Sequence, residues 1–417
     1  MKKIVLLIVL LLPSLFCHGI YFPSLMGELE KIDGIYYLIH PSYELGAGYG
    51  FATIPELPDG VKVLADYEGD ITIRDSVLFE GINYPVTMIA PYAFSGFSNL
   101  RSVVIPATVK TIGKCAFYHY RKLSHVVIPD GVTTIENNTF SYSGIKSVDF
   151  PKSVTTIKDA AFAYCDSLVT IQWPENITEM GDRVFQSCKN LTTVILPDHL
   201  KMIGSEAFDG CTSLSTVVLP AELSAIHYRS FRGCSNLTSI EWPENLATIG
   251  EDAFRSTGLT SIQLPDHVNS IGSTAFSCPI KTAVLGSGLR WMAPSFFGEG
   301  ADLTDLYCYA ETPPQLTFSY DGARYSLFHS DLQERVVLHV PASAIDLYKT
   351  DRMWKDFATI LPINDGPDGI SEIDANPQRT PDSSSDGAKC YDLQGRRLTD
   401  KPTKGIYVSK GKKFVVK

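Results

Sequence analysis

Apolar and polar positions alternate along this chain in a pattern that repeats every 22 or 23 residues. Each unit ends on a run with the spacing L-x-x-L-x-L, as in the segment from Leu214 to Leu219, where alternate residues are apolar. This alternation predicts a short strand with every second side chain facing inward, and the repeat length predicts stacked coils that share one core. Phenylalanine recurs once per unit, at Phe94, Phe117, Phe140, Phe162, Phe185, Phe208, Phe231, Phe254 and Phe276.

Proline closes the strand-like run of each unit. It has no N–H for a strand ladder and holds the residue before it extended, so every predicted strand ends at the same place. Within the strand, Val217 and Leu219 are expected to face inward and Thr216 and Val218 outward. The proline column is Pro106, Pro129, Pro151, Pro174, Pro197, Pro220, Pro243 and Pro265.

The unit I-x-x-x-A-F-x-x-C-x-x-L-x-x-V-x-L-P resembles that of the BspA-like bacterial surface leucine-rich repeats. The resemblance covers about residues 89–292, and the segments 32–37 and 306–314 are similar to the edges of that family. It implies a mostly β, right-handed leucine-rich-repeat solenoid in a secreted or surface-attached, non-catalytic protein. It also implies binding to host matrix proteins, other cell-surface proteins or glycans.

Changes in composition divide the chain. We expect a signal peptide, a β-rich N-terminal cap, about nine solenoid repeats, a C-terminal cap, a flexible linker rich in Asp, Ser, Pro and Gly, and a small β tail of two hairpins. The tail is similar to C-terminal sorting segments of exported bacterial proteins, including those of the type IX route, but is shorter. The boundaries are 1–19, 20–88, 89–292, 293–363, 364–389 and 390–417.

The first residues predict export. Lys2 and Lys3 precede an apolar run of 13 residues, Ile4 to Phe16, which is too short to span a membrane. Cleavage after Gly19 is one outcome, and lipidation of Cys17 is the alternative, although Phe16 is bulky for that signal.

Charge argues against a nucleic-acid partner. Cleavage after Gly19 removes two lysines and no acidic residue, which takes the formal net charge from −10 to −12. Such a surface repels phosphates. The tail is the exception: residues 390–417 carry eight Lys or Arg against Asp392 and Asp400, a local charge of +6.

Four cysteines occupy one column of the repeat, three residues after the phenylalanine. The same column holds Tyr120 and Thr257 in other units, which neither a zinc site nor a disulfide ladder would accommodate. We therefore expect buried thiols that fill space, with an occasional bridge between neighbouring coils as the alternative. The four are Cys165, Cys188, Cys211 and Cys234.

The outward positions of the strands form the predicted binding face. One column is rich in Ser and Thr, which also pair well across strands for purely structural reasons. The other mixes apolar and polar residues, a composition suited to protein contact. We expect Trp173 and Trp242, which lie in an inward column, to belong to the core. The predicted face consists of Ser102, Val104, His125, Val127, Asp149, Thr170, Gln172, Thr193, Ile195, Thr216, Val218, Glu241 and Gln263.

Motifs for chemistry are missing from the sequence: it contains no H-E-x-x-H, G-x-S-x-G, Walker or calcium-loop pattern. We therefore expect a monomeric, non-enzymatic binding or adhesion protein with no cofactor, no metal, no nucleic-acid partner and no transmembrane span. The alternative is an envelope-associated scaffold without a dedicated ligand.

Overall fold

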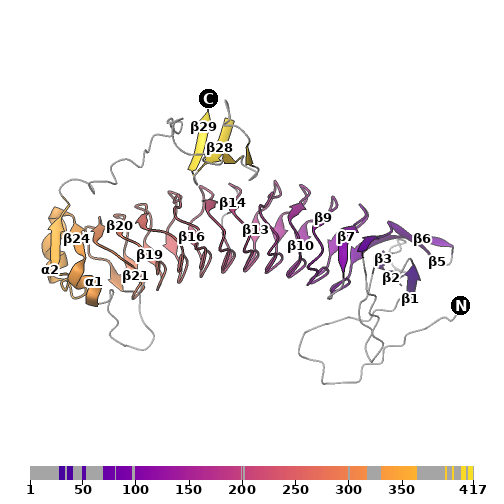
Figure 1. The fold of residues 1–417 in the computed structure, drawn as a ribbon, viewed down its shortest axis with the longest axis horizontal. Coiled ribbons are helices and arrows are strands. Elements are labelled where there is room, and N and C mark those ends of the chain that lie inside the picture. The colour runs from indigo at the N-terminus through magenta and orange to yellow at the C-terminus, as the bar shows by residue number, and fades with distance from the viewer. Residues whose placement is uncertain are drawn as a thin grey trace, which may run out of the picture.

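The computed structural model describes residues 28–32, 35–40, 49–52, 69–79, 81–95, 99–198, 200, 202–298, 301–316, 330–363, 390–391, 397–398, 405–409 and 412–416. Most of them form a long stack of coils, a β-solenoid of about eleven turns (Figure 1). The predicted fold class, a mostly β leucine-rich-repeat solenoid, is confirmed. The signal segment 1–19, with Cys17, and the linker 364–389 lie outside the described residues.

The first of two strand ladders, here called ladder A, carries the L-x-x-L-x-L run of each coil. Its strands pair in parallel in three groups, β4-β7-β9-β11, β14-β15 and β18-β20-β22-β24-β25. Two coils without a ladder A strand separate the groups, because residues 171–172 and 239–241 form no strand. In both coils the sequence Trp-Pro-Glu-Asn follows, at residues 173–176 and 242–245. The strands are β4 (Gly69–Thr72), β7 (Leu100–Val104), β9 (His125–Val127), β11 (Ser147–Asp149), β14 (Thr193–Ile195), β15 (Thr216–Val218), β18 (Ser261–Gln263), β20 (Thr282–Leu285), β22 (Asp305–Cys308), β24 (Val337–Val340) and β25 (Thr359–Pro362).

A second ladder, here called ladder B, was not predicted. It lies on the other side of each coil, just before the phenylalanine, and most of its strands are only two residues long. A pair such as Thr111–Ile112 is too short to show an alternation of apolar and polar residues. Its strands are β6 (Ile82–Ile89), β8 (Thr111–Ile112), β10 (Thr134–Ile135), β12 (Thr156–Ile157), β13 (Glu179–Met180), β16 (Ala225–Ile226), β17 (Thr248–Ile249), β19 (Ser270–Ile271), β21 (Trp291–Met292) and β23 (Gln315–Leu316).

The phenylalanine column is the centre of the core. All nine rings are at most 1% exposed. Consecutive ring centroids lie 5.3–5.6 Å apart and consecutive ring planes differ by 3–15°. Each ring therefore fills the gap between its two neighbours, which is the interlocking that a repeat solenoid needs for stability.

The turn that holds each phenylalanine is also hydrogen-bonded to the next coil. The Phe208 N–H donates to the Ser230 carbonyl at 2.9 Å, and the Glu206 N–H donates to the Tyr228 carbonyl at 2.8 Å. In this turn the backbone is left-handed two residues before and two residues after the phenylalanine, at Glu206 (φ 57°) and Gly210 (φ 75°). Thus the strand-free turns also contribute a regular line of bonds along the stack.

The two Trp side chains pack against the core as expected. Each is half-buried and meets a phenylalanine of the next coil edge to face, Trp173 on Phe185 at 5.6 Å and Trp242 on Phe254 at 5.2 Å between ring centroids.

Strands at the N-terminal end extend the stack. Within the predicted β-rich cap, the strand-like runs Ile35–Ile39 and Asp70–Ile73 correspond to β2 and β4, whereas the run Val61–Ala65 lies outside the described residues. β4 and β6 already belong to ladders A and B, and the remaining strands join β6 in the order β1-β2-β3-β6-β5. The additional strands are β1 (Glu28–Ile32), β2 (Ile35–His40), β3 (Tyr49–Ala52) and β5 (Ser76–Phe79).

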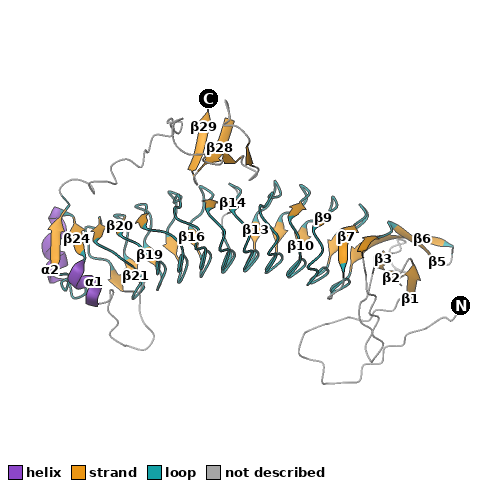
Figure 2. Ribbon diagram, viewed as in Figure 1, coloured by secondary structure: helices purple, strands orange, loops and turns teal. Residues whose placement is uncertain are grey.

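Short helices lie at the C-terminal end of the stack (Figure 2). They are α1 (Ser330–Arg335), the 3-10 turn η1 (Ala342–Ala344) and α2 (Ile345–Thr350). The segment after Pro341 forms η1 and α2, and α1 was not predicted. Trp354 and Phe357 are buried at this end, and the Trp354 indole N–H donates to the Pro314 carbonyl at 3.0 Å.

The last strands form a separate four-stranded sheet, here called the C-terminal sheet. It contains β26 (Cys390–Tyr391), β27 (Arg397–Leu398), β28 (Gly405–Ser409) and β29 (Lys412–Val416), in the order β27-β26-β28-β29. The two hairpins predicted from the sequence are therefore present, and the pairing of β26 with β28 joins them into one sheet.

Candidate binding face

Ladder A presents its outward side chains on one face of the solenoid, here called the outer face. In β9, β11 and β18 the middle residue is buried and its two neighbours are exposed. The parallel register puts equivalent residues of successive coils next to one another, as with Ser147 beside His125 and Asp149 beside Val127. The two predicted columns are therefore two rows on one surface.

Two valines stand out at the N-terminal end of the outer face. Val104 is 56% exposed and Val127 is 53% exposed, and they lie on the paired strands β7 and β9. We call them the apolar pair. Two exposed apolar side chains on neighbouring strands form a small contiguous apolar patch, so this pair is a candidate contact point.

Polar groups surround the apolar pair. Asp70 accepts hydrogen bonds from the Arg101 guanidinium at 3.0 Å and the Ser102 hydroxyl at 2.8 Å. On the other side, His125 Nε2 lies 3.7 Å from Asp149 Oδ2. The arrangement of an apolar centre within a polar rim is typical of protein interfaces.

The middle of the predicted face differs from its ends. Thr193, Ile195 and Thr216 are only 2%, 5% and 8% exposed, although they occupy outward positions. Beside them, Thr170 and Val218 are half-buried. Something other than the coil's own core must therefore cover β14 and β15.

Exposed polar residues flank this covered part on both sides. Gln172 lies on the N-terminal side, and Glu241 and Gln263 lie on the C-terminal side. A shallow hollow lined by Val148, Phe150, Thr170 and Gln172 among others opens beside the first gap in ladder A. Together the thirteen predicted residues lie along one face, and its exposed parts are two separate regions.

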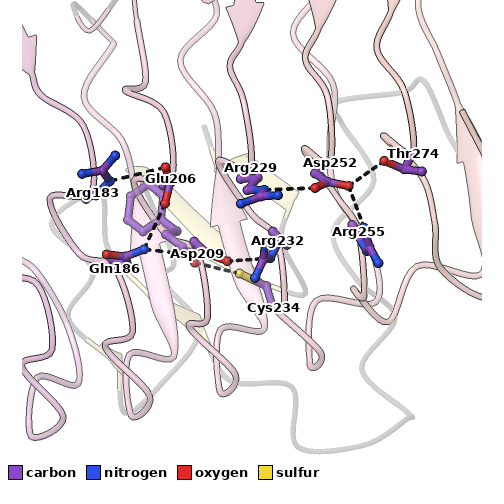
Figure 3. A network of polar contacts seen from close by, with 11 residues as sticks. Arg183, Gln186, Glu206, Asp209, Arg229, Arg232, Cys234, Asp252, Arg255 and Thr274 are labelled. Atoms are coloured by element: carbon purple, nitrogen blue, oxygen red, sulfur yellow. Dashed lines mark hydrogen bonds and ion pairs between the residues drawn. The ribbon is translucent and has the colours of Figure 1, made fainter. Parts of the chain in front are cut away.

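A network of charged groups lies along the turns beside the phenylalanine column (Figure 3). Sequence reasoning missed it because its members come from different coils and two different positions of the repeat. Glu206 accepts from Gln186 at 3.1 Å and lies 3.4 Å from Arg183, and Asp209 lies 3.3 Å from Arg232. The sequence did contain a signal for this network: Arg, Asp and Glu recur just before and just after the phenylalanine of successive coils.

Asp252 is the most buried member of the network, with a side chain only 2% exposed. It accepts from Thr274 at 2.6 Å, Arg229 at 3.0 Å and Arg255 at 3.3 Å. Burial alone would raise the pKa of Asp252, but these three hydrogen bonds hold the pKa below its usual value. The acidic and basic side chains of this network pair with one another. We therefore interpret the network as a structural feature that links neighbouring coils.

The column cysteines are buried thiols, as expected. The seven cysteines from Cys115 to Cys308 are all free. In the column, each S–H donates to the carbonyl of a phenylalanine in the preceding coil, as in Cys211 to Phe185 at 3.1 Å. Burial raises the pKa of Cys211 to about 12, so the thiol is a poor nucleophile and a poor metal ligand. Among the described residues, no three His, Cys, Asp or Glu side chains group as metal ligands.

These features define the class: a β-solenoid of leucine-rich repeats with a continuous aromatic core and one extended strand face. The BspA type leucine rich repeat region matches residues 87–215 and 180–304, with six copies. These segments make up more than half of the chain, and the chain belongs to this family.

Solved structures of bacterial repeat proteins are similar to the chain. A leucine-rich repeat protein from Bacteroides ovatus is 25% identical, with 76% of this chain and 79% of that chain covered and a TM-score of 0.57. A leucine rich cell surface protein from Faecalibacterium prausnitzii is 20% identical over 81% and 95%, with a TM-score of 0.42. The pneumococcal vaccine antigen PcpA is 17% identical over 81% and 98%, with a TM-score of 0.44. No curated protein sequence matches the chain.

None of the helices in the described ranges has the length and apolar character that crossing a membrane would require.

Proposed function

We propose that this chain is an exported, surface-associated protein that binds another protein through the exposed parts of its outer face, without catalysis. The observation that carries the proposal is the apolar pair. Two β-branched side chains, each more than half exposed, stand side by side on a hydrogen-bonded parallel strand pair. Rigid strands lose little entropy on binding, which favours the use of such a pair as an anchor.

The chemistry of the rim supports a protein partner. Asp70 and Arg101 bond to each other, and His125 lies beside Asp149, so the rim offers donors and acceptors of both signs. A polyanion would require a surplus of basic groups, whereas a protein surface matches a mixed rim. Ladder A has eleven strands and two strand-free coils at about 4.8 Å spacing, so its face is about 60 Å long and suits an extended contact.

Export is supported by the first residues of the sequence. Lys2 and Lys3 followed by an apolar run of 13 residues match a secretory signal. A surface location would expose the outer face to matrix proteins and to proteins of other cells. These are the partner classes that the proposal names.

The test is a binding array of matrix proteins, cell-surface proteins and glycans, probed with the mature full chain. Val104→Asp combined with Val127→Asp places two charges at the centre of the contact. We expect binding of the array protein to weaken at least ~10-fold, since each buried unpaired charge costs more than 1.4 kcal/mol.

Met202→Asp is the matched control. Met202 is also 56% exposed but precedes ladder B, away from the outer face. Its variant should bind like the parent, and circular dichroism melts should show that all variants fold. The proposal fails if no array protein binds, if only glycans bind, or if both variants weaken binding equally.

A further inference from the structure

The covered centre of the outer face carries a further inference. At equivalent outward positions, Val127 is 53% exposed and Ile195 is 5% exposed. Their paired neighbours in the sheet are of similar size, Asp149 beside Val127 and Val218 beside Ile195. Neighbouring side chains therefore do not explain the tenfold difference, and the cover of Ile195 must lie above the sheet.

The C-terminal sheet is the element that lies there. In Figure 1, β28 and β29 stand directly beside β14 on the ladder A side of the stack. In Figure 3, seen from another direction, the pale yellow strands of the same sheet lie behind the coils that carry Glu206 and Asp209. Both views place the C-terminal sheet against the coils of β14 and β15, where the outward residues lose their exposure.

We propose that the C-terminal sheet, residues 390–416, docks on the outer face of β14 and β15 and acts as a built-in occupant of the face. Thr193, Ile195 and Thr216 are its docking surface. An external protein that binds across the whole outer face must displace it. The docking stands on burial and position alone, whereas the displacement rests on the proposed function.

Charge favours this docking. Residues 390–417 carry +6, and the rest of the chain after Gly19 carries −18. The two parts attract each other, and attraction of this kind speeds encounter and holds orientation. The exposed polar residues on either side of the covered part, Gln172 and Glu241, do not add positive charge that would oppose it.

A weak contact is sufficient because the C-terminal sheet and the solenoid belong to one chain. Such covalent linkage makes the contact intramolecular, with an effective concentration on the order of 1 mM. An intrinsic dissociation constant of about 10 μM would then keep the face about 99% covered. A competing partner would bind ~100-fold more weakly than it binds the uncovered face.

Thiol labelling in the intact chain tests the docking. One variant carries Ile195→Cys and its matched control carries Val127→Cys, both with Cys115→Ser and Cys390→Ser and with a protease site placed between residues 364 and 389. The remaining described cysteines are buried. Because cleavage follows folding, the solenoid does not need to fold without the C-terminal sheet.

We expect a maleimide to label Ile195→Cys at least ~10-fold more slowly than Val127→Cys in the intact chain. After cleavage and removal of the fragment, the two rates should agree within ~3-fold. Equal rates in the intact chain, or continued protection of Ile195→Cys after the fragment is removed, would overturn the proposal. No ligand takes part, so this outcome is independent of the binding array.

Discussion

The phenylalanine column provides the sharpest prediction about stability. Phe208 is fully buried, and its ring lies 5.6 Å from that of Phe185 and 5.4 Å from that of Phe231. Phe208→Ala removes a ring that buries roughly 150–200 Å², worth about 4 kcal/mol at about 25 cal/mol/Å². Measured losses for buried Phe→Ala changes are of the same size, about 3–5 kcal/mol.

Urea unfolding followed by circular dichroism measures this loss. Phe208→Leu is the matched control, because leucine keeps most of the apolar volume and loses only the two ring contacts. We expect the free energy of unfolding to fall by about 4 kcal/mol for Phe208→Ala and by about 1–1.5 kcal/mol for Phe208→Leu. A loss below about 1 kcal/mol for Phe208→Ala would refute the idea that interlocked rings hold the coils together.

Three further predictions concern the turns, the charged network and the cysteines. Ser256 has φ 58° where the preceding coils have Gly210 and Gly233. Ser256→Gly should therefore raise the free energy of unfolding by about 0.5 kcal/mol, and Gly233→Ser should lower it by a similar amount. A lower free energy of unfolding for both variants in urea titrations would contradict this. Asp252→Asn should cost about 2 kcal/mol at pH 7. Because the pKa of Asp252 is lowered in the folded state, its stabilisation is present above the unfolded pKa and is lost as pH falls through the folded pKa, so the gap between variant and parent should close in acid. A gap that does not vary with pH would argue against an ionised Asp252. Finally, Cys165, Cys188, Cys211 and Cys234 should resist maleimide at pH 8 in the native protein and react in urea, as followed by peptide mass spectrometry; rapid native labelling would contradict their raised pKa values.

Much of the solenoid is predictable from sequence because its cause is local and repeated. The Phe208 and Pro220 columns mark where each coil turns and where each strand stops, and the structure follows both. Ladder B could not be predicted because a strand of two residues, such as Thr111 and Ile112, is too short to show a periodic pattern. The charged network could not be predicted because Arg229 and Asp252 become partners only when two coils stack.

The state of the outer face is less predictable for a different reason. Ile195 and Val127 occupy equivalent positions of the repeat, yet they are 5% and 53% exposed. The proposed docking of the C-terminal sheet accounts for this difference. The sequence identified the C-terminal hairpins correctly but contains no local signal for where they dock. Contacts between segments far apart in a chain depend on the assembled surface, which one repeat unit does not describe.

The most direct test of the account is a photo-cross-linking measurement on the outer face. A photoreactive residue is placed at Val127, on the outer face, or at Trp291, which is 45% exposed on ladder B, and each protein is irradiated with the matrix or cell-surface protein that the array identifies. The account predicts an adduct from position 127 and none from position 291. An adduct formed only from position 291, or equally from both, would contradict recognition through the outer face.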